Sequence, residues 1–596
     1  MNPARPYVAR RPAAALERTS RLRAKLAFYA LAVIAGFLIW RLYVVQIRQG
    51  PWLAHRAYEQ RLRTVGLSAR RGTIYDRNGV ILVRSVPSQS VYATTSDVHD
   101  KTRTAQSLAP LLGLPEPFVE KRLLARDSYV VIERKVPSTA ADQLAARPLD
   151  GISVVPENTG IRFMPAGRLA STMLGFTGID ENGLEGLEYE FDGILRGTAG
   201  EMSLETDQFG RALPFAPPHV LEPSHAGHSL VLTLDSYLQY SVERVLDETV
   251  TKWHARSGSA LVMDPWTGEI LALANSPDYD ARDFDRFSPD QRRDRAVTDA
   301  YEPGSTFKLI TAAAALESGK VSVTQRFPAR DEMRIGSHVI HNAEDGFLAT
   351  SGNGETLEQI VDYSHNVGAA EVGLAIGQRT MERTIRAFGF GAATGVDLPG
   401  ENPGIVPALA DWGDTTLPTI SFGHGIATTP LAMARAYCAI VNGGFLLRPR
   451  VVSEILGEDG SIVYRYGTEV ERRVISAKTA ATLRGIMRTV VTRGTGNPTA
   501  QIPGYTTAGK TGTAQIAENG SYVPGQYVAS FVGTVPAESP RYVILVKIER
   551  PVGAIYGSVV AAPAFAEIAR LAMLHAGVLP HFDRLVRAPS VSKSRI

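Results

Sequence analysis

Ser305 and Lys308 lie three residues apart in the segment EPGSTFKLITAAAALESGK, residues 302–320. Pro303-Gly304 predicts a sharp turn, and the alanine-rich run predicts a helix that carries both side chains on one face. An amine placed there takes the hydroxyl proton if its pKa falls from ~10.4 to ~7–8. Burial, the positive end of the helix and a second cation could together lower the pKa that far. The pair therefore predicts a nucleophilic serine activated by a neutral lysine.

The S-x-x-K spacing is a weak signal when it stands alone. A second copy, Ser590–Lys593, lies in a C-terminal segment that is not expected to fold. An isolated match is more often a helix cap followed by a solvated lysine than a catalytic pair. Further motifs must decide between these two interpretations.

Two such motifs follow in the chain. Ser364-His365-Asn366 comes after LEQIVDY, an apolar-periodic helix that could present it to a cleft, whereas the similar Ser351–Asn353 lies in a glycine-rich loop. Lys510-Thr511-Gly512-Thr513 occurs once, and its glycine permits a close backbone approach at a strand edge. S-x-x-K, S-x-N and K-T-G in this order are typical of serine acyl transfer on D-Ala-D-Ala or β-lactam carbonyls. Together they predict one acyl-transfer site.

The elements that must position these motifs follow a proline-rich linker, Pro214–Ser229. LVLTLD, residues 230–235, predicts a strand, and Ser236–Lys252 predicts an amphipathic helix. One face of that helix carries Leu238, Val242, Val245, Leu246 and Thr249. SALVMDPWTGEILALAN, residues 259–275, predicts a hairpin with Pro265–Gly268 in its turn. Ordered elements are expected to about Leu579, with a loose basic tail beyond.

The chain before the linker predicts a second domain. With 596 residues the protein exceeds the size of one hydrophobic core. Residues 47–222 alternate short β-rich runs with polar turns, which indicates an extended α+β module without chemistry of its own. Helices are expected at Thr104–Leu112, although Pro110 falls inside it, and at Ala140–Ala146.

The N-terminus combines a basic arm with an apolar run. Seven basic residues and one acidic residue lie between Met1 and Lys25, and the 15 residues Leu26–Trp40 are apolar, small or aromatic. Counting through Val45, with Arg41 snorkelling to the head groups, gives adequate length for a spanning helix. A buried soluble helix would not explain the basic arm, and the A-x-A site of a cleaved signal peptide is absent from RLYVVQIRQG. An uncleaved signal anchor fits best, with the arm inside and the rest exported.

The remaining candidate functional residues are each interpreted as structural or surface residues. Cys438 is expected in the core, and the histidines of His225–His228 and His338–His341 are expected to be polar residues rather than metal ligands. Gly423–Gly425, the sequence GHG, is interpreted as a structural loop. The charged run Asp283–Arg295 is expected to be a solvated surface and not a nucleic-acid patch. Neither a cofactor nor a metal is expected.

Beyond the anchor, the sequence resembles the class B penicillin-binding proteins. RRGTIYDRNGVIL, residues 70–82, is similar to their juxtamembrane signature, and MPAGRLASTMLGFTGIDENGLEGLEYEFDGILRGTAG is similar to the end of their pedestal domain. MDPWTGEILALANSPDYD and RAVTDAYEPGSTFK match the start of their catalytic domain. ASFVGTVPAESPRYVILVKIERPVGAIYGSVVAAPAF looks more like the division-specific FtsI branch than the elongation branch. His365 stands where Ser or Asp is commoner, and no PASTA-like repeats follow the catalytic domain.

The resemblance implies a role for each motif residue. Ser305 would be the nucleophile and Lys308 its base, and Ser364 would relay protons while Asn366 orients the substrate amide. The backbone N–H groups of Ser305 and Thr513 would form the oxyanion hole, each donor worth roughly 3–4 kcal/mol in comparable enzymes. Lys510 would help keep Lys308 neutral and attract the substrate carboxylate. The carboxylate-binding strand comprises Thr511, Gly512 and Thr513.

The resemblance also implies a multidomain α+β and α/β architecture. A cytoplasmic arm (residues 1–25), a transmembrane signal anchor (26–46) and a non-catalytic, dimerisation-type pedestal (47–222) would precede the transpeptidase domain (223–580) and a flexible tail (581–596). The transpeptidase domain would have the serine β-lactamase-like fold, an antiparallel sheet flanked by helices. The protein would be a single-pass protein of the inner membrane, with its N-terminus cytoplasmic and its catalytic domain extracytoplasmic.

The function so implied is D,D-transpeptidation of peptidoglycan stem peptides, in septal synthesis during division. Its ligands would be D-Ala-D-Ala stem peptides and β-lactams, and no nucleic acid. No glycosyltransferase signature is found before the linker, so polymerisation is expected from an FtsW-like, SEDS-type partner among other divisome membrane proteins. Three alternatives remain open: an elongation transpeptidase, a D,D-carboxypeptidase or β-lactamase, and a non-enzymatic β-lactam sensor or divisome scaffold.

Overall fold

The computed structural model describes residues 13–136, 138–157, 160–206, 219–343, 353–518 and 520–581. Four features discussed above therefore lie wholly or partly outside the described residues: the first 12 residues of the basic arm, the start of the linker at 214–218, residues 351 and 352 of the second S-x-N copy, and the tail from 582 with Ser590–Lys593. The chain divides into two compact units, one of residues 1–68 with 199–224 and one of residues 69–198 with 225–596.

The first unit contains the apolar N-terminal helix. Helix α1 (Ala13–Tyr43) continues through a π-helical turn (Val44–Arg48) and is followed by α2 (Gly50–Arg61). The helical stretch Arg18–Arg48 contains an 18-residue segment with a mean hydropathy of 2.0, so it is long and apolar enough to cross a membrane, and it includes the predicted anchor. Strands β1 (Leu62–Leu67), β8 (Gly200–Glu205) and β9 (His219–Glu222) form an antiparallel sheet in this unit.

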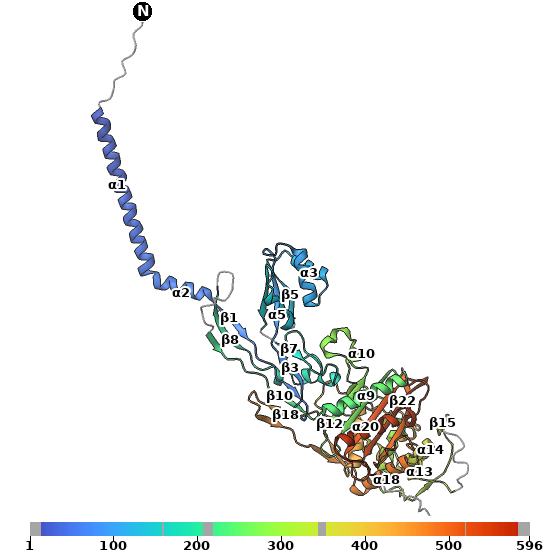
Figure 1. Ribbon diagram of the computed structural model, residues 1–596. Helices are drawn as coiled ribbons and strands as arrows, with labels where there is room; N and C mark the ends of the chain where they lie inside the picture. The colour runs from blue at the N-terminus through green and yellow to red at the C-terminus, as the bar shows by residue number, and fades with distance from the viewer. Residues whose placement is uncertain are drawn as a thin grey trace, which may run out of the picture. The chain divides into compact units, whose positions relative to one another are not determined.

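The second unit begins with a small α+β layer (Figure 1). Strands β4 (Gln89–Thr94), β5 (Tyr129–Val136) and β6 (Ile152–Pro156) form its sheet, with α3 (Lys101–Leu112), α4 (Glu116–Leu123) and α5 (Ser138–Ala146). Both helices predicted here are confirmed. Helix α3 begins three residues earlier than predicted because the Asp100 side chain accepts the Arg103 N–H and caps it.

A six-stranded sheet joins the regions before and after the linker. Its order is β19 (Ile462–Arg465), β18 (Val452–Leu456), β10 (Ser229–Leu232), β2 (Ile74–Tyr75), β3 (Ile81–Val86) and β7 (Ile161–Phe163). The predicted strand 230–235 is therefore too long at its C-terminal end. It stops at Leu232 because Asp235 instead accepts the Leu238 N–H and caps the next helix.

The sheet behind the motifs is antiparallel, as the resemblance implied, and it has five strands. Its order is β12 (Ile270–Ser276), β11 (Ser257–Met263), β23 (Tyr542–Glu549), β22 (Ser521–Val535) and β21 (Ala508–Glu518), and β11–β12 is the predicted hairpin. Every residue of β11 and β12 is buried, and both strands are apolar except at Ser257, Ser259, Asn275 and Ser276. Alternate residues point to opposite faces, so Ala260 and Val262 join one core and Leu261 and Met263 the other.

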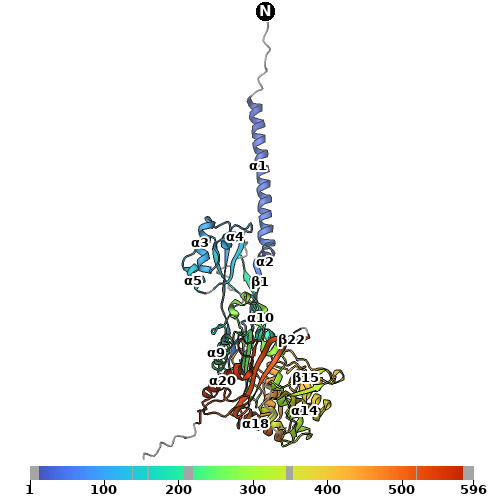
Figure 2. The same ribbon diagram turned by 90° about the vertical axis from the view of Figure 1, so that its right-hand side faces the viewer.

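Helices cover both faces of this sheet (Figure 2). On one face lie α9 (Ser236–Lys252), with the predicted bounds, and α20 (Ala562–His575). Four of the five residues of the predicted face of α9 are buried, and the fifth, Thr249, bonds the carbonyl of Val245. The helical stretch Gly557–His575, which ends in α20, is also long and apolar enough to cross a membrane, but α20 packs within this core.

The other face carries the helices that bear the motifs. They are α12 (Lys308–Glu317), α13 (Leu357–Asp362), α14 (Asn366–Ile376), α17 (Pro430–Val441) and α18 (Ala477–Thr492). Cys438 is buried in α17, as predicted.

The expectation of a solvated surface at Asp283–Arg295 is wrong at its C-terminal end. Arg295 is 2% exposed. Its guanidinium bonds Asp290 at 2.7 Å and Asp299 at 3.1 Å, and this pairing makes burial of the charge tolerable.

Candidate active site

Ser305 lies in a single 3-10 turn, Gly304–Phe307, immediately before α12, rather than inside the first turn of the α-helix. Gly304 has φ of +55°, and a Cβ at this position would lie 2.8 Å from the carbonyl oxygen of Thr513. The Tyr437 hydroxyl donates to the carbonyl of Thr306 at 2.8 Å. A glycine and a buried tyrosine thus hold the Ser305 turn close to the K-T-G strand.

The S-x-N motif forms the tight connection between α13 and α14. Ser364 has φ of +63°, a left-handed conformation that is unusual for a residue with a side chain. Asn342 Oδ1 accepts the N–H groups of Asn366 at 2.8 Å and Val367 at 3.1 Å and so caps α14. Sequence reasoning missed Asn342, because nothing in its local sequence links it to a helix that begins 24 residues later.

The K-T-G motif lies on β21, the edge strand of the five-stranded sheet, as predicted. A Cβ on Gly512 would lie 2.4 Å from Ser530 Oγ and 2.9 Å from Thr306 Cγ2, so the close backbone approach predicted for this glycine is confirmed. The Thr511 hydroxyl shares a 2.8 Å hydrogen bond with that of Thr495. The Thr513 hydroxyl accepts the Gly557 N–H at 3.1 Å.

Lys308 reaches the S-x-N motif instead of Ser305. Its Nζ donates to the Ser364 carbonyl at 2.5 Å and to Asn366 Oδ1 at 2.8 Å, and it lies 3.4 Å from Ser364 Oγ. In the described part of the chain, none of its hydrogen bonds goes to Ser305 Oγ. For Lys308 to take the Ser305 proton, a movement of one of the two side chains must bring the groups into contact.

Lys510 meets Lys308 at the same hydroxyl. Its Nζ donates to Ser364 Oγ at 3.0 Å, and both lysines are buried, with exposed fractions of 0% for Lys510 and 1% for Lys308. Burial, and then the charge of Lys510, hold the pKa of Lys308 well below its ordinary value, while Glu355 raises it. Burial lowers the pKa of Lys510 to about 7. The site therefore favours the neutral amine that an activating base requires.

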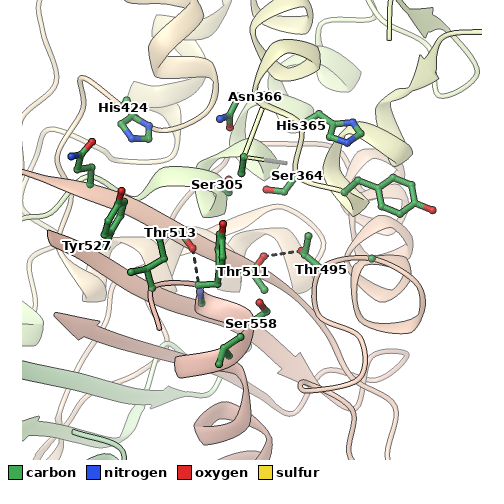
Figure 3. Close-up of a pocket in the computed structure, with 18 of the residues that line it drawn as sticks. Ser305, Ser364, His365, Asn366, His424, Thr495, Thr511, Thr513, Tyr527 and Ser558 are labelled. Carbon is green, nitrogen blue, oxygen red and sulfur yellow. Dashed lines mark hydrogen bonds between the residues drawn. The ribbon is translucent and has the colours of Figure 1, made fainter. Parts of the chain in front are cut away.

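Hydroxyl and amide residues of the three motifs line one pocket of about 700 Å³, whereas the buried Lys308 and Lys510 are not among its lining residues. Ser305, Ser364, Asn366, Thr511 and Thr513 all line it. Figure 3 shows Asn366 and His424 on one side of Ser305, with Thr511, Thr513 and Ser558 on the opposite side. The structure thus brings together the three motifs that are distant in the sequence.

The loop Gly423–Gly425, interpreted above as structural, also contributes His424 to the pocket lining. The carbonyl of Gly423 accepts the Gly304 N–H at 3.1 Å, so this loop is bonded to the Ser305 turn. Burial, together with the charge of Lys308, lowers the pKa of His424 to about 4, and its imidazole is therefore neutral at pH 7. Sequence reasoning also missed Tyr527 and Ser558 in the lining.

This geometry suits acyl transfer. A serine hydroxyl lines an open pocket, a buried amine with a lowered pKa lies beside the S-x-N serine of the same pocket, and the Thr511 and Thr513 hydroxyl groups, the first bonded to Lys510, can bind a carboxylate. The backbone N–H groups of Ser305 and Thr513 belong to residues on opposite walls of the same pocket.

Comparisons with known proteins agree with this chemistry. The penicillin binding protein transpeptidase domain family matches residues 258–570, and the penicillin-binding protein dimerisation domain family matches residues 67–232. Stage V sporulation protein D of Bacillus subtilis is 34% identical over 95% of this chain and 88% of its own length. Peptidoglycan D,D-transpeptidase FtsI of Escherichia coli is 33% identical over 90% of this chain and 88% of its own. The crystal structure of penicillin binding protein 3 from Mycobacterium tuberculosis complexed with aztreonam covers 88% of this chain and 99% of its own, with 30% identity and a TM-score of 0.68.

Proposed function

The chain belongs to the class B penicillin-binding proteins and is a peptidoglycan D,D-transpeptidase, and we propose that Ser305 is the nucleophile of its reaction. The observation that carries this assignment is the convergence of Lys308 and Lys510 on Ser364 Oγ, in the pocket that Ser305 lines. A serine beside a buried amine is the arrangement that acyl transfer requires.

The first half-reaction forms an acyl-enzyme. Ser305 Oγ attacks the penultimate D-Ala carbonyl of a stem peptide while neutral Lys308 takes its proton. The C–N bond then breaks, and the terminal D-Ala leaves as an amine that receives a proton through Ser364. Backbone N–H groups of Ser305 and Thr513 stabilise the oxyanion. Lys510, Thr511 and Thr513 hold the substrate carboxylate, and Gly512 lets strand β21 approach it.

The second half-reaction makes the cross-link. An amine from a neighbouring stem peptide attacks the ester carbonyl, the bond to Ser305 Oγ breaks, and one amine proton returns to that oxygen. A β-lactam enters the first half-reaction and stalls there, because its leaving amine stays attached to the acyl group.

The nucleophile is tested with a labelled penicillin. The wild-type protein is expected to form a covalent adduct of one label per chain, and Ser305→Ala none. Mass spectrometry should place the label on the peptide that contains Ser305. An adduct of Ser305→Ala at wild-type stoichiometry would show that another residue is the nucleophile. Rapid release of the label by water would favour a β-lactamase or carboxypeptidase over a transpeptidase.

For the cellular role we propose septal synthesis. The similarity to FtsI of Escherichia coli supports it, while the similarity to stage V sporulation protein D keeps other wall-building steps as the second candidate. Depletion in the source cell is expected to give filaments, whereas rounded cells would indicate an elongation role.

We further propose that α1 spans the inner membrane with the basic arm in the cytoplasm, and that an FtsW-like, SEDS-type glycosyltransferase binds the anchor and pedestal. The length and hydropathy of Arg18–Arg48 and the basic residues before it support this topology. A protein whose anchor is replaced by an unrelated one is expected to lose its normal localisation, and unchanged localisation and activity would contradict the partner assignment.

A further inference from the structure

His365, the variable residue of the S-x-N motif, is bonded to a buried carboxylate. Its Nδ1 lies 2.5 Å from Glu355 Oε2, and the exposed fractions of the two residues are 5% and 2%. Glu355 is on β16 (Glu355–Thr356), which pairs with β13 (Arg326–Phe327). The imidazole is therefore tied to the short strand that immediately precedes α13, the helix that leads into the motif.

The backbone makes room for this pair. A Cβ on Gly368, in α14, would lie 2.3 Å from Glu355 Oε1 and 2.7 Å from Ile360 Cγ1, so only glycine lets the carboxylate approach the helix. Glu355 Oε1 is buried and has no hydrogen-bond partner among the described residues. The hydrogen bond from His365 is thus the one that the structure gives to this carboxylate side chain.

The same residue anchors the turn that holds Lys308. The His365 N–H donates to the Ile360 carbonyl at 3.0 Å, and its carbonyl accepts the Ala369 N–H at 3.3 Å. The preceding residue, Ser364, is left-handed, a conformation that persists only where its surroundings fix it. All three hydrogen-bond acceptors of Lys308 belong to Ser364 and Asn366, the two neighbours of His365.

We propose that Glu355 and His365 form a positioning pair that holds the Ser364–Asn366 turn against Lys308 and tunes the charge of that lysine. This inference rests on the proposed function, because it assigns an action to the Lys308 amine during acylation. Glu355 is not among the residues that line the pocket, whereas His365 is, and the role assigned to both is to position the S-x-N turn rather than to contact the substrate.

The electrostatics of the surroundings agree with the tuning role. Lys510 and Glu355 act on Lys308 with opposite signs: the lysine lowers its pKa and the glutamate raises it. Lys308 in turn lowers the pKa of His424. On the far side of Glu355 lies Glu371, whose pKa is raised to about 7 by burial and by Glu355, and lowered in part by Arg330. Loss of the Glu355 charge should therefore leave Lys308 neutral down to a lower pH.

The test separates geometry from charge by measuring acylation rates with a labelled penicillin between pH 5 and 9. His365→Ala removes the donor and is expected to slow acylation at least ~10-fold, whereas His365→Asn, whose amide can donate from a similar position, is expected to recover to within ~3-fold of wild type. Glu355→Gln keeps an acceptor oxygen but loses the charge, so the pH of half-maximal acylation should fall by about one unit. His338→Ala, an exposed histidine on β15 (His338–His341), is the matched control and should behave as wild type.

Each of these results either supports or contradicts the Glu355–His365 pair. The proposal is overturned if His365→Ala reacts within ~2-fold of wild type, if His365→Asn is as slow as His365→Ala, or if Glu355→Gln leaves the pH profile unmoved. Thermal melting of each variant identifies one that does not fold, in which case Glu355→Gln alone decides. A wild-type protein that forms no adduct would contradict the proposed function, whereas a wild-type protein that reacts alongside unaffected variants contradicts only this pair.

Discussion

Lys308 and Lys510 share one hydrogen-bond partner, since their Nζ atoms lie 3.4 Å and 3.0 Å from Ser364 Oγ. Two buried ammonium groups at one hydroxyl repel each other and lack the water that would screen them. The protonation state of lowest free energy leaves at least one of the two amines neutral. The serine of the S-x-N motif is therefore the point at which the lysine side chains of the other two motifs meet.

Replacing Lys510 by Met should move the acid limb of the pH–rate profile of acylation to higher pH. The cation of Lys510 lowers the pKa of Lys308, so its loss raises that pKa and a larger fraction of Lys308 is protonated at pH 7. We expect the half-maximal pH to rise by about one unit and the plateau rate to fall about 10- to 100-fold, because the carboxylate loses its cation. The measurement is the pH dependence of penicillin acylation, with the exposed Lys478→Met on α18 as the control. If the acid limb of the profile moved to lower pH instead, the Lys510 charge would not be lowering the pKa of Lys308.

Substitution of Asn366 tests how Lys308 responds when its neutral hydrogen-bond acceptor is replaced by a charged one. Its Oδ1 accepts from Lys308 at 2.8 Å, and its Nδ2 donates to the His341 carbonyl at 2.9 Å. Asn366→Asp puts a carboxylate at that oxygen, which raises the Lys308 pKa and keeps the lysine protonated. Acylation at pH 7 is expected to fall about 100-fold or more in Asn366→Asp, and the loss in this variant should shrink as the pH rises.

Asn366→Ala is the comparison for this prediction. It removes the acceptor without adding charge, so its loss should stay constant across pH. Equal pH profiles for the two variants would show that charge at this position does not act through Lys308.

The sequence predicted the elements whose signal is local and missed the partners that the fold recruits. Helix α9 and the β11–β12 hairpin follow from apolar periodicity and turn residues, and both are confirmed. Asn342 and His424 reach the site only through tertiary contacts with segments distant along the chain, and Glu355 through a side-chain bond to a residue 10 positions later; no periodicity marks any of the three.

The charged run that ends at Arg295 also shows that sequence does not reveal tertiary partners. Its composition is typical of a solvated surface, but Asp290 and Asp299 pair with Arg295 and make its burial possible. Composition records how many charges a segment carries. It does not record which of them neutralise each other once the chain has folded.

Gly512 is predicted to be essential for steric reasons. A Cβ there would lie 2.4 Å from Ser530 Oγ and 3.2 Å from the Pro303 carbonyl oxygen, and neither the strand nor the Ser305 turn can retreat without disturbing the site. Gly512→Ala should cost about 1–3 kcal/mol of stability and most of the acylation rate. Gly485→Ala is the control, because nothing lies within 4 Å of that position in α18 and alanine should stabilise the helix by about 0.5–1 kcal/mol. The prediction fails if both variants melt and react alike.

Asp294 should make the protein less stable as the pH rises. Its side chain caps the short helix α11 (Arg295–Thr298), with Oδ1 accepting from Asn275 at 3.0 Å, while Oδ2 is buried without a hydrogen-bond partner among the described residues. Burial raises its pKa from 3.8 to about 7. The folded state therefore binds this proton more tightly than the unfolded state, and the stability present below about pH 4 is lost progressively up to about pH 7.

Asp294→Asn does not titrate, and its carbonyl oxygen can keep the cap. Its melting temperature should exceed that of wild type by at least ~2 °C at pH 8 and by less at pH 5. Asp459→Asn, at an exposed turn where Ser461 lowers the pKa of the aspartate, should show no such gain at pH 8. A difference for Asp294→Asn that grows toward acid pH would mean that the carboxylate is stabilised in its charged form.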